Sequence, residues 1–242
     1  IGTEFNNGII QLILGNYHEG WKAYESGLLN KSRDLRNGHE KFDELPEWKP
    51  DMHFDSVALI GEQGIGDEIM YSTIIGCLLK KVKNIYYFCD PRLIEVLKKR
   101  FPTINFLFKE KEYNIKKFQA KLAIGSLPRY FRGSEEDFSK VNLLNCNNNN
   151  KTPSRLKLPQ HKKIIGISWH TTNKQFGPER NIDLDLFSPI LKNKNYNFLN
   201  LQYGNHEIEI KELETKLNRK LFLNHDNDNL NDVIGLAANI NK

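Results

Sequence analysis

The chain has 242 residues, of which 39% are hydrophobic and 27% are charged, and it contains 14 Phe and 9 Tyr. This supply of apolar side chains suffices for a sizeable core and excludes global disorder. The net charge of +5 comes from 35 basic and 30 acidic residues, which are interspersed along the chain as in Lys109-Glu110-Lys111-Glu112. A nucleic-acid-binding protein would gather its cations in a stripe, so we expect no nucleic-acid partner.

Apolar runs such as Ile74–Leu79 are far shorter than the ~20 residues of a transmembrane helix, so no transmembrane segment is predicted. No signal peptide is seen, and the start at Ile1 without a methionine indicates a fragment or a processed chain. The three cysteines, Cys77, Cys89 and Cys146, have neither CxxC nor Cys/His metal spacing. We interpret them as free thiols in a reducing, cytoplasmic compartment, and we expect no metal and no cofactor.

Residues 1–30 are predicted to form two helices. Apolar residues recur at helical spacing from Ile9 to Leu14, Gly15-Asn16 is a stop signal, and Trp21 begins a second apolar face. The stretch NNGIIQLILGNYHEGWKAYESGL resembles the last unit of a tetratricopeptide array. A single such hairpin cannot bury both faces, so the resemblance implies further repeats or a capping role, and a protein partner that binds this segment.

Residues 31–54 are polar and are predicted to be a linker that docks Trp48 on the next domain. Residues 55–150 then alternate between predicted strands and helices, which indicates a parallel sheet. The strands are expected at 56–60, 84–89, 104–108 and 122–125, with helices at 67–81 and after Pro91. In the first of these helices, Met70, Ile74, Cys77 and Leu78 are predicted to face the sheet.

Residues 134–160 break this rhythm with an asparagine run and are predicted to join two domains. Residues 151–242 repeat the alternation, so the fold class is α/β. Strands are expected at 163–169, 197–202 and 221–223, and helices at 184–191, 208–217 and 230–240. The second domain is incomplete in this prediction, because another strand would be expected after Lys242.

The stretch Gly61-Glu62-Gln63-Gly64-Ile65-Gly66-Asp67-Glu68 lies between a predicted strand and helix. Its glycines could adopt unusual φ values or admit close backbone approach, and the helix N-terminus could hold an anion. The order GxxGxG, without a following Lys-Ser/Thr, matches neither the dinucleotide fingerprint nor the P-loop. A purely structural interpretation stays open, in which Asp67 caps the helix and Glu68 complements its dipole.

Five elements in order, GEQGIGDEIMYS, CDPRLIEVLKKRFP, GSLPRYFR, GISWHTTN and LQYGN, resemble tetratricopeptide-linked glycosyltransferases related to the ADP-heptose heptosyltransferases. The resemblance spans about Asn6 to Ile240 and implies a GT-B fold, in which two Rossmann-like domains face each other across a cleft. It implies an inverting, metal-independent transfer from a nucleotide-diphosphate sugar to an unknown acceptor hydroxyl.

The resemblance makes Asp67 the proposed catalytic base, with adjacent Glu68 ranked second because it points about 100° away on a helix. The acceptor side would comprise Gly64, Gly66, Glu68, Ser126 and Arg129. For the last two, a proline turn with a surface arginine is an equally open interpretation.

The nucleotide-sugar side implied by the resemblance comprises seven residues: Ser168, Trp169, His170, Lys174, Arg180, Gln202 and Tyr203. Lys174 and Arg180 could neutralise the diphosphate. His170 stands where relatives often have Arg or Lys, so it could be a surface residue, and Tyr203 could simply pack under the loop.

Two other functions remain open on the sequence. One is a repeat-bearing adaptor that binds proteins without catalysis. The other is a nicotinamide-dependent oxidoreductase, disfavoured by the glycine order, although Asp90 follows the second predicted strand, near where such enzymes hold the ribose.

Overall fold

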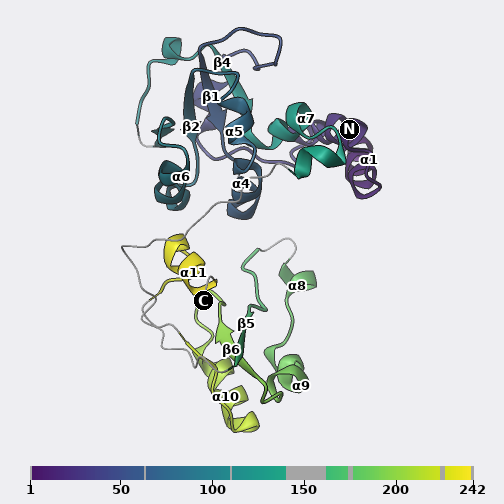
Figure 1. Ribbon diagram of the computed structural model, residues 1–242, viewed down its shortest axis with the longest axis vertical. Coiled ribbons are helices and arrows are strands. Elements are labelled where there is room, and N and C mark those ends of the chain that lie inside the picture. Colours follow the sequence, from purple (N-terminus) through teal and green to yellow (C-terminus); the bar gives the residue numbers. More distant parts are fainter. Residues whose placement is uncertain are drawn as a thin grey trace. The chain divides into compact units, whose positions relative to one another are not determined.

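The computed structural model describes residues 2–62, 64–109, 111–139, 162–173, 177–223 and 227–240 (Figure 1). It divides into two compact units, residues 1–145 and 146–242. The domain boundary predicted at 150/151 lies outside the described residues. None of the described helices has the length and apolar character required to cross a membrane.

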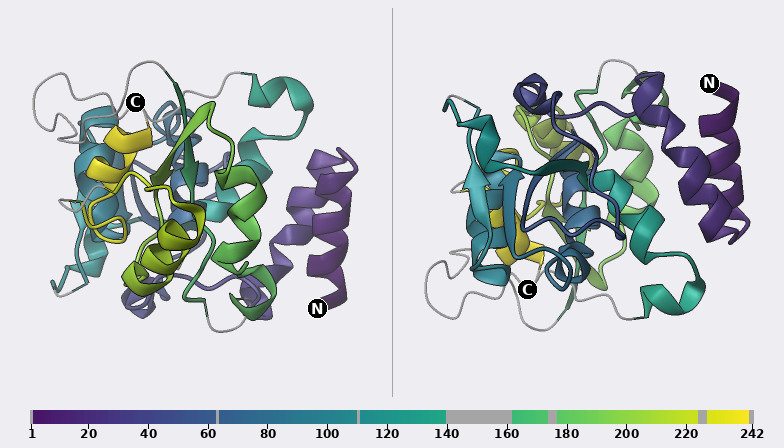
Figure 2. Two further views of the ribbon diagram at one scale, coloured as in Figure 1. Left: turned by 90° about the horizontal axis from the view of Figure 1, so that it is seen from below. Right: turned by 90° about the horizontal axis from the view of Figure 1, so that it is seen from above.

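The first unit begins with two antiparallel helices, α1 (Gly2–Ile13) and α2 (Tyr17–Tyr24), which lie side by side in both views of Figure 2. The chain reverses at Gly15, whose φ of 82° favours glycine. The helices can approach closely because Gly8 and Gly20 lack side chains. A Cβ on Gly8 would lie 2.7 Å from the Tyr24 amide nitrogen, and one on Gly20 would lie 2.8 Å from the Leu12 side chain. A short helix α3 (Ser26–Leu29) follows.

The core of the first unit is a parallel sheet in the order β3-β2-β1-β4. Its strands are β1 (Ser56–Ile60), β2 (Asn84–Phe88), β3 (Asn105–Leu107) and β4 (Ala120–Ala123). Neighbouring strands pair in register, for example Ile60 with Phe88 and with Ala123. All four predicted strands are therefore present, and the unit is a mixed α/β structure compatible with a Rossmann-like fold.

The connections between these strands are helical. The stretch between β1 and β2 forms α4 (Ile65–Ser72) and α5 (Ile75–Leu78), and the stretch between β2 and β3 forms η2 (Pro91–Leu93) and α6 (Ile94–Arg100). The remaining short helices are η3 (Ile115–Lys117), η4 (Ile124–Ser126), α7 (Leu127–Phe131) and η5 (Glu135–Phe138). The hairpin packs beside α7 (Figure 1).

The prediction of which residues are buried in the helix after β1 was partly wrong. Ile74 and Leu78 are buried, but Met70 is 52% exposed, whereas Glu68 is fully buried. The spacing of the buried residues is helical, but the inward face is rotated because Glu68 points into the protein, where it forms hydrogen bonds. The predicted single helix is also interrupted by a turn at residues 73–74.

One face of the sheet is covered by the linker rather than by long helices. Phe42, at the end of η1 (His39–Phe42), packs with Ala58, Ile60, Phe88 and other apolar residues of that face. Trp48 is buried as predicted, and its amide donates to the Lys121 carbonyl oxygen at 2.8 Å. The linker is thus an integral layer of the first unit.

The second unit has a two-stranded parallel sheet, β5 (Lys163–Ile167) beside β6 (Tyr196–Asn200). Its helices are α8 (Gly177–Arg180), η6 (Leu184–Phe187), α9 (Ser188–Leu191), α10 (Glu207–Leu217) and α11 (Val233–Ile240). The strand predicted at 221–223 is only a single bridge from Phe222 to Leu199. The core gathers Trp169, Leu184, Phe198, Leu213 and their apolar neighbours.

Candidate functional site

The candidate site of the first unit lies at the carboxyl edge of its sheet. β1 runs into the glycine-containing stretch that starts α4, and β4 runs into η4 and α7. The strand order places β1 and β4 side by side, so the chain direction across the sheet reverses between them. In open parallel sheets this reversal point is where ligands usually bind.

The glycines at this edge make room for carboxylates. A Cβ on Gly61 would lie 2.7 Å from the Glu68 carboxylate, one on Gly64 would lie 2.3 Å from an Asp67 carboxylate oxygen, and one on Gly125 would clash with Glu62. Positive φ, the other use predicted for them, is absent from the described glycines of this stretch. At Gly61, Gly64 and Gly125, the space that a pyrophosphate would need beside the backbone is therefore taken by acidic side chains of the protein itself.

Glu68 belongs to a buried ion-pair network. Its carboxylate accepts hydrogen bonds from Arg36, from the Tyr87 hydroxyl at 2.9 Å and from the Asp90 amide at 3.1 Å. Burial raises the pKa of the Glu68 carboxyl, and the Arg36 guanidinium opposes this shift. With its oxygens engaged in this way, Glu68 holds the linker against the sheet edge.

Asp90 is likewise engaged, at the end of β2. Its carboxylate accepts hydrogen bonds from the Arg92 amide at 3.0 Å and from the Arg92 side chain at 2.8 and 2.9 Å, and it lies 3.4 Å from Arg36. Burial alone would raise the pKa of Asp90, but Arg92 and Arg36 hold it below its ordinary value. These contacts leave Asp90 poorly placed to bind a ribose, which weakens the nicotinamide alternative.

A second ion-pair network joins the hairpin to the strand ends. The Arg33 guanidinium donates to Glu62 at 2.6 Å and to Glu25 at 2.9 Å, and Glu62 also accepts from the Gly125 amide at 2.9 Å. Burial by itself would lower the pKa of Arg33, but Glu62 and Glu25 raise it overall.

Two predicted acceptor-side residues contact this network. The Ser126 hydroxyl donates to Glu25 at 2.8 Å, and the Arg129 guanidinium lies 3.9 Å from the same carboxylate. Ser126 is fully buried, whereas Arg129 keeps a side-chain exposure of 38%. Arg129 is therefore the member of this pair that a ligand could reach directly.

Asp67 differs from the other carboxylates at this edge. It lies in the first turn of α4 and is exposed, and no hydrogen bond or salt bridge to its carboxylate occurs among the described residues. Partial burial of the carboxyl raises the pKa of Asp67, and the nearby Arg33 opposes the shift. The structural interpretation in which Asp67 caps the helix finds no support, because Gly64 is the N-cap residue. Gly66 beside it has open space where a side chain would be.

Sequence reasoning missed the partners of these acidic residues. Arg33 and Arg36 lie in a segment interpreted as a polar linker, and Glu25 ends a helix. A signal existed, since two arginines in an Arg-x-x-Arg pattern precede the acidic glycine stretch. Pairing them with Glu62 and Glu68 requires knowing that the linker folds over the sheet edge.

In the second unit the predicted residues cluster around Gln202, after β6. The side-chain oxygen of Gln202 accepts from Ser168 at 3.0 Å and from the Trp169 and His170 amides at 2.9 Å. Its side-chain nitrogen donates to the carbonyl oxygens of His170 and Tyr203. Gln202 thus fixes the loop after β5 to the loop after β6, and its hydrogen-bonding groups are already used.

The other predicted residues of this unit surround that connection. The indole of Trp169 donates to Glu209 at 3.2 Å, and the Tyr203 hydroxyl accepts from the Thr172 amide at 3.2 Å. His170 has a buried Nδ1 without a partner in the described structure. Arg180 ends α8, and Lys174 lies outside the described residues.

A polar cavity of about 140 Å³ opens beside these residues. It is lined by nine residues of the second unit: Asn200, Gln202, Gly204, His206, Glu207, Ile210, Leu223, Asn227 and Asn229. Amide side chains of this kind can pair with the edges of a base or a ribose. No cluster of three potential metal ligands occurs within the described ranges.

Comparison with known proteins yields one distant similarity. The chain is 25% identical over 270 residues to Protein FlbA of Caulobacter vibrioides (strain ATCC 19089 / CIP 103742 / CB 15). The alignment includes 97% of this chain but 43% of FlbA, so the chain spans less than half the length of that relative. No protein-family model matches the chain, and no solved structure does.

Proposed function

We propose that this chain forms part of a glycosyltransferase of the GT-B kind, with its first unit on the acceptor side. The observation that carries the proposal is the exposed carboxylate of Asp67 in the first turn of α4, beside the reversal point of a parallel sheet. Of the acidic side chains at this edge discussed above, Glu62, Glu68 and Asp90 are bound to arginines, and Asp67 is the one left accessible.

In the proposed reaction, Asp67 accepts the proton of the acceptor hydroxyl. The hydroxyl oxygen forms a bond to the anomeric carbon, and the bond from that carbon to the nucleotide diphosphate breaks, which inverts the configuration. A carboxylate in this role typically contributes ~10²–10⁴-fold to the rate. Partial burial raises the pKa of Asp67, which makes it a stronger base than an ordinary aspartate, and the positive charge of Arg33 opposes this shift of the pKa.

The second unit would bind the nucleotide sugar. In this proposal Gln202 positions the loop after β5, while the amide-lined cavity and Tyr203 contact the base or ribose. Arg180 and Lys174 would receive the negative charge of the departing diphosphate without a metal. Ser168 and Trp169 would act by holding the loop, since both are already bonded to neighbouring side chains.

The helical hairpin fits a tetratricopeptide unit in this proposal. Its tight crossing at Gly8 and Gly20, together with the small-x₃-aromatic spacing from Gly20 to Tyr24, agrees with the pattern of that repeat. Glu25 connects the hairpin to Ser126 at the acceptor edge. A protein bound to the hairpin would therefore lie next to the acceptor side of the first unit.

A non-catalytic adaptor is the second candidate, and the hairpin surface favours it. Ile10, Ile13, Leu14 and Leu29 are between 53% and 79% exposed. Exposed apolar groups of this kind often mark a protein-binding surface. In an adaptor, the ion pairs at the sheet edge would serve only to hold the hairpin in place.

Transfer assays with a panel of nucleotide-diphosphate sugars discriminate between the two candidates. The natural protein would be incubated with each sugar, and release of the nucleotide diphosphate would be followed by mass spectrometry. The glycosyltransferase proposal expects saturable binding of at least one donor and slow release by hydrolysis even without the acceptor. If no donor of the panel binds and the chain instead captures a protein through residues of the hairpin, the adaptor is favoured.

A further inference from the structure

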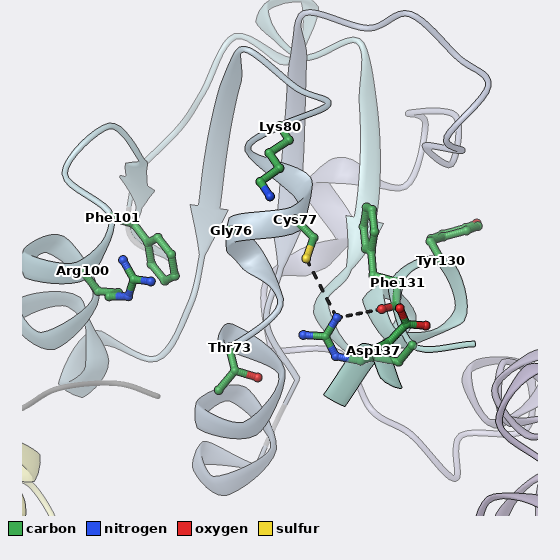
Figure 3. Close-up of a pocket in the computed structure, with 10 residues that line it drawn as sticks. Thr73, Gly76, Cys77, Lys80, Arg100, Phe101, Tyr130, Phe131 and Asp137 are labelled. Carbon is green, nitrogen blue, oxygen red and sulfur yellow. Dashed lines mark hydrogen bonds between the residues drawn. The ribbon is translucent and has the colours of Figure 1, made fainter. Parts of the chain in front are cut away.

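A separate pocket in the first unit is lined by an unusual excess of positive charge. It has a volume of about 380 Å³ and is built where α5, α6 and α7 end (Figure 3). Its polar lining contains three cationic side chains, Lys80, Arg100 and Arg132, against one carboxylate, Asp137. None of these residues belongs to the proposed transfer site.

Arg132 is the feature that sets this pocket apart. Only 3% of the residue is exposed, yet its Nη2 has no hydrogen-bond partner in the described structure. Nη1 donates to the Phe131 carbonyl oxygen at 2.7 Å and lies 3.9 Å from the Cys77 sulfur, as the dashed lines in Figure 3 mark. No carboxylate of the described residues pairs with this guanidinium. A buried charge without a counter-ion is costly, which points to a missing anionic partner.

The lining carboxylate does not fill this role. Asp137 accepts hydrogen bonds from the Gly133 and Ser134 amides, each at 3.1 Å, and so caps η5. Cations also favour the last carbonyls of helices, and the bond from Nη1 to Phe131 fits that explanation. The guanidinium carbon also lies 6.0 Å from the centre of the Phe138 ring. Neither contact gives Nη2 a hydrogen-bond acceptor, and neither requires Lys80 and Arg100 to line the same pocket.

We propose that this pocket binds a small molecule that carries a phosphate-type oxyanion. A guanidinium offers paired N–H donors that match the oxygens of such a group, and Lys80 and Arg100 add further positive charge. Phe101, Tyr130 and Phe131 line the same pocket and provide an apolar surface for the rest of the molecule. The volume is in the range of small-molecule sites.

Binding of inorganic phosphate and of phenyl phosphate to the whole chain tests the proposal, with chloride at equal ionic strength as the comparison. Saturable binding of phosphate is expected, with tighter binding of the aromatic ester. Arg132→Met, which keeps the apolar stem but removes the charge, should weaken binding by about tenfold or more. Lys80→Ala should weaken it several-fold, while the matched control Lys81→Ala, at an exposed position outside the lining, should not change it.

Alkylation of Cys77 gives a second readout that does not depend on the stability of Arg132→Met. Cys77 is partly exposed and lines the pocket, whereas Cys89 is buried. Phosphate should slow alkylation of the Cys77 peptide, measured by mass spectrometry, in the wild type and less so in Lys80→Ala. The proposal is overturned if phosphate acts no differently from chloride, or if Lys80→Ala and Lys81→Ala behave alike in both measurements.

Discussion

At the scale of single residues, neighbouring Asp67 and Glu68 have opposite environments. Glu68 is fully buried and bound by Arg36, Tyr87 and the Asp90 amide, whereas Asp67 is exposed and belongs to no such network. Because neighbouring residues of a helix point about 100° apart, α4 directs the carboxylate of Glu68 into the protein and that of Asp67 toward solvent. The sequence places both at the sheet edge, but it does not reveal which of them faces the protein.

Removing the charge of Glu68 should destabilise the fold. Glu68→Gln is expected to lower the free energy of unfolding by about 1–3 kcal/mol, because Arg36 would lose its ion pair with Glu68 and keep only the contact with Asp90 at 3.4 Å. Chemical denaturation measures this change. The control Glu95→Gln breaks an exposed pair with Lys99 and should cost less than about 1 kcal/mol. Equal effects of the two substitutions would contradict the structural role of Glu68.

The raised pKa of Asp67 predicts the acidic limb of the pH profile. If Asp67 is the catalytic base, as proposed, it must be deprotonated, so kcat/KM should fall as the pH drops through the pKa of Asp67 in the free protein. Because partial burial raises this pKa above its ordinary value of 3.8, the decline should begin at a higher pH than an unshifted aspartate would give. A limb at or below the ordinary value would count against Asp67 as the base.

At the scale of elements, the hairpin depends on close contact between α1 and α2. Gly8→Ala would place a methyl group 2.7 Å from the Tyr24 amide nitrogen, so the helices must separate. The expected loss is about 1–3 kcal/mol of unfolding free energy, with a lower Tm in calorimetry. The control Gly76→Ala has no atom within 4 Å of the added group and should be neutral or stabilising by up to about 1 kcal/mol. A Gly8→Ala variant as stable as this control would refute the tight crossing.

Periodicity predicted that four strands form the first sheet, because each contains apolar residues between stretches of other structure. The bounds were less accurate: the strand predicted at 122–125 is β4 (Ala120–Ala123), and Ile124 and Gly125 belong to η4. Periodicity failed where a charged residue faces inward. Glu68 rotated the buried face of α4, and Met70, predicted to be core, is exposed. The linker was predicted to dock through Trp48, but its role as a covering layer through Phe42 could not be predicted, since long-range contacts leave no local pattern.

At the scale of the molecule, each unit has its own sheet and its own apolar core. The first unit presents an accessible carboxylate at the sheet edge, and the second presents an amide-lined cavity at the carboxyl end of β6. Fold alone does not determine chemistry, so the proposed transfer depends on these two groups of residues. The similarity to FlbA extends over both units. Sugar transfer should therefore be tested on a protein that contains both units, rather than on either unit alone.

Turnover of the Asp67→Asn variant shows whether Asp67 is the catalytic base of the proposed sugar transfer. The substitution keeps the size of an exposed side chain, so the circular dichroism spectrum and the Tm should match those of the wild type. With a donor and acceptor that the wild type uses, we expect kcat to fall by ~10²-fold or more while donor affinity is retained. A variant that keeps its fold and transfers sugar within about twofold of the wild-type rate would rule out Asp67 as the base.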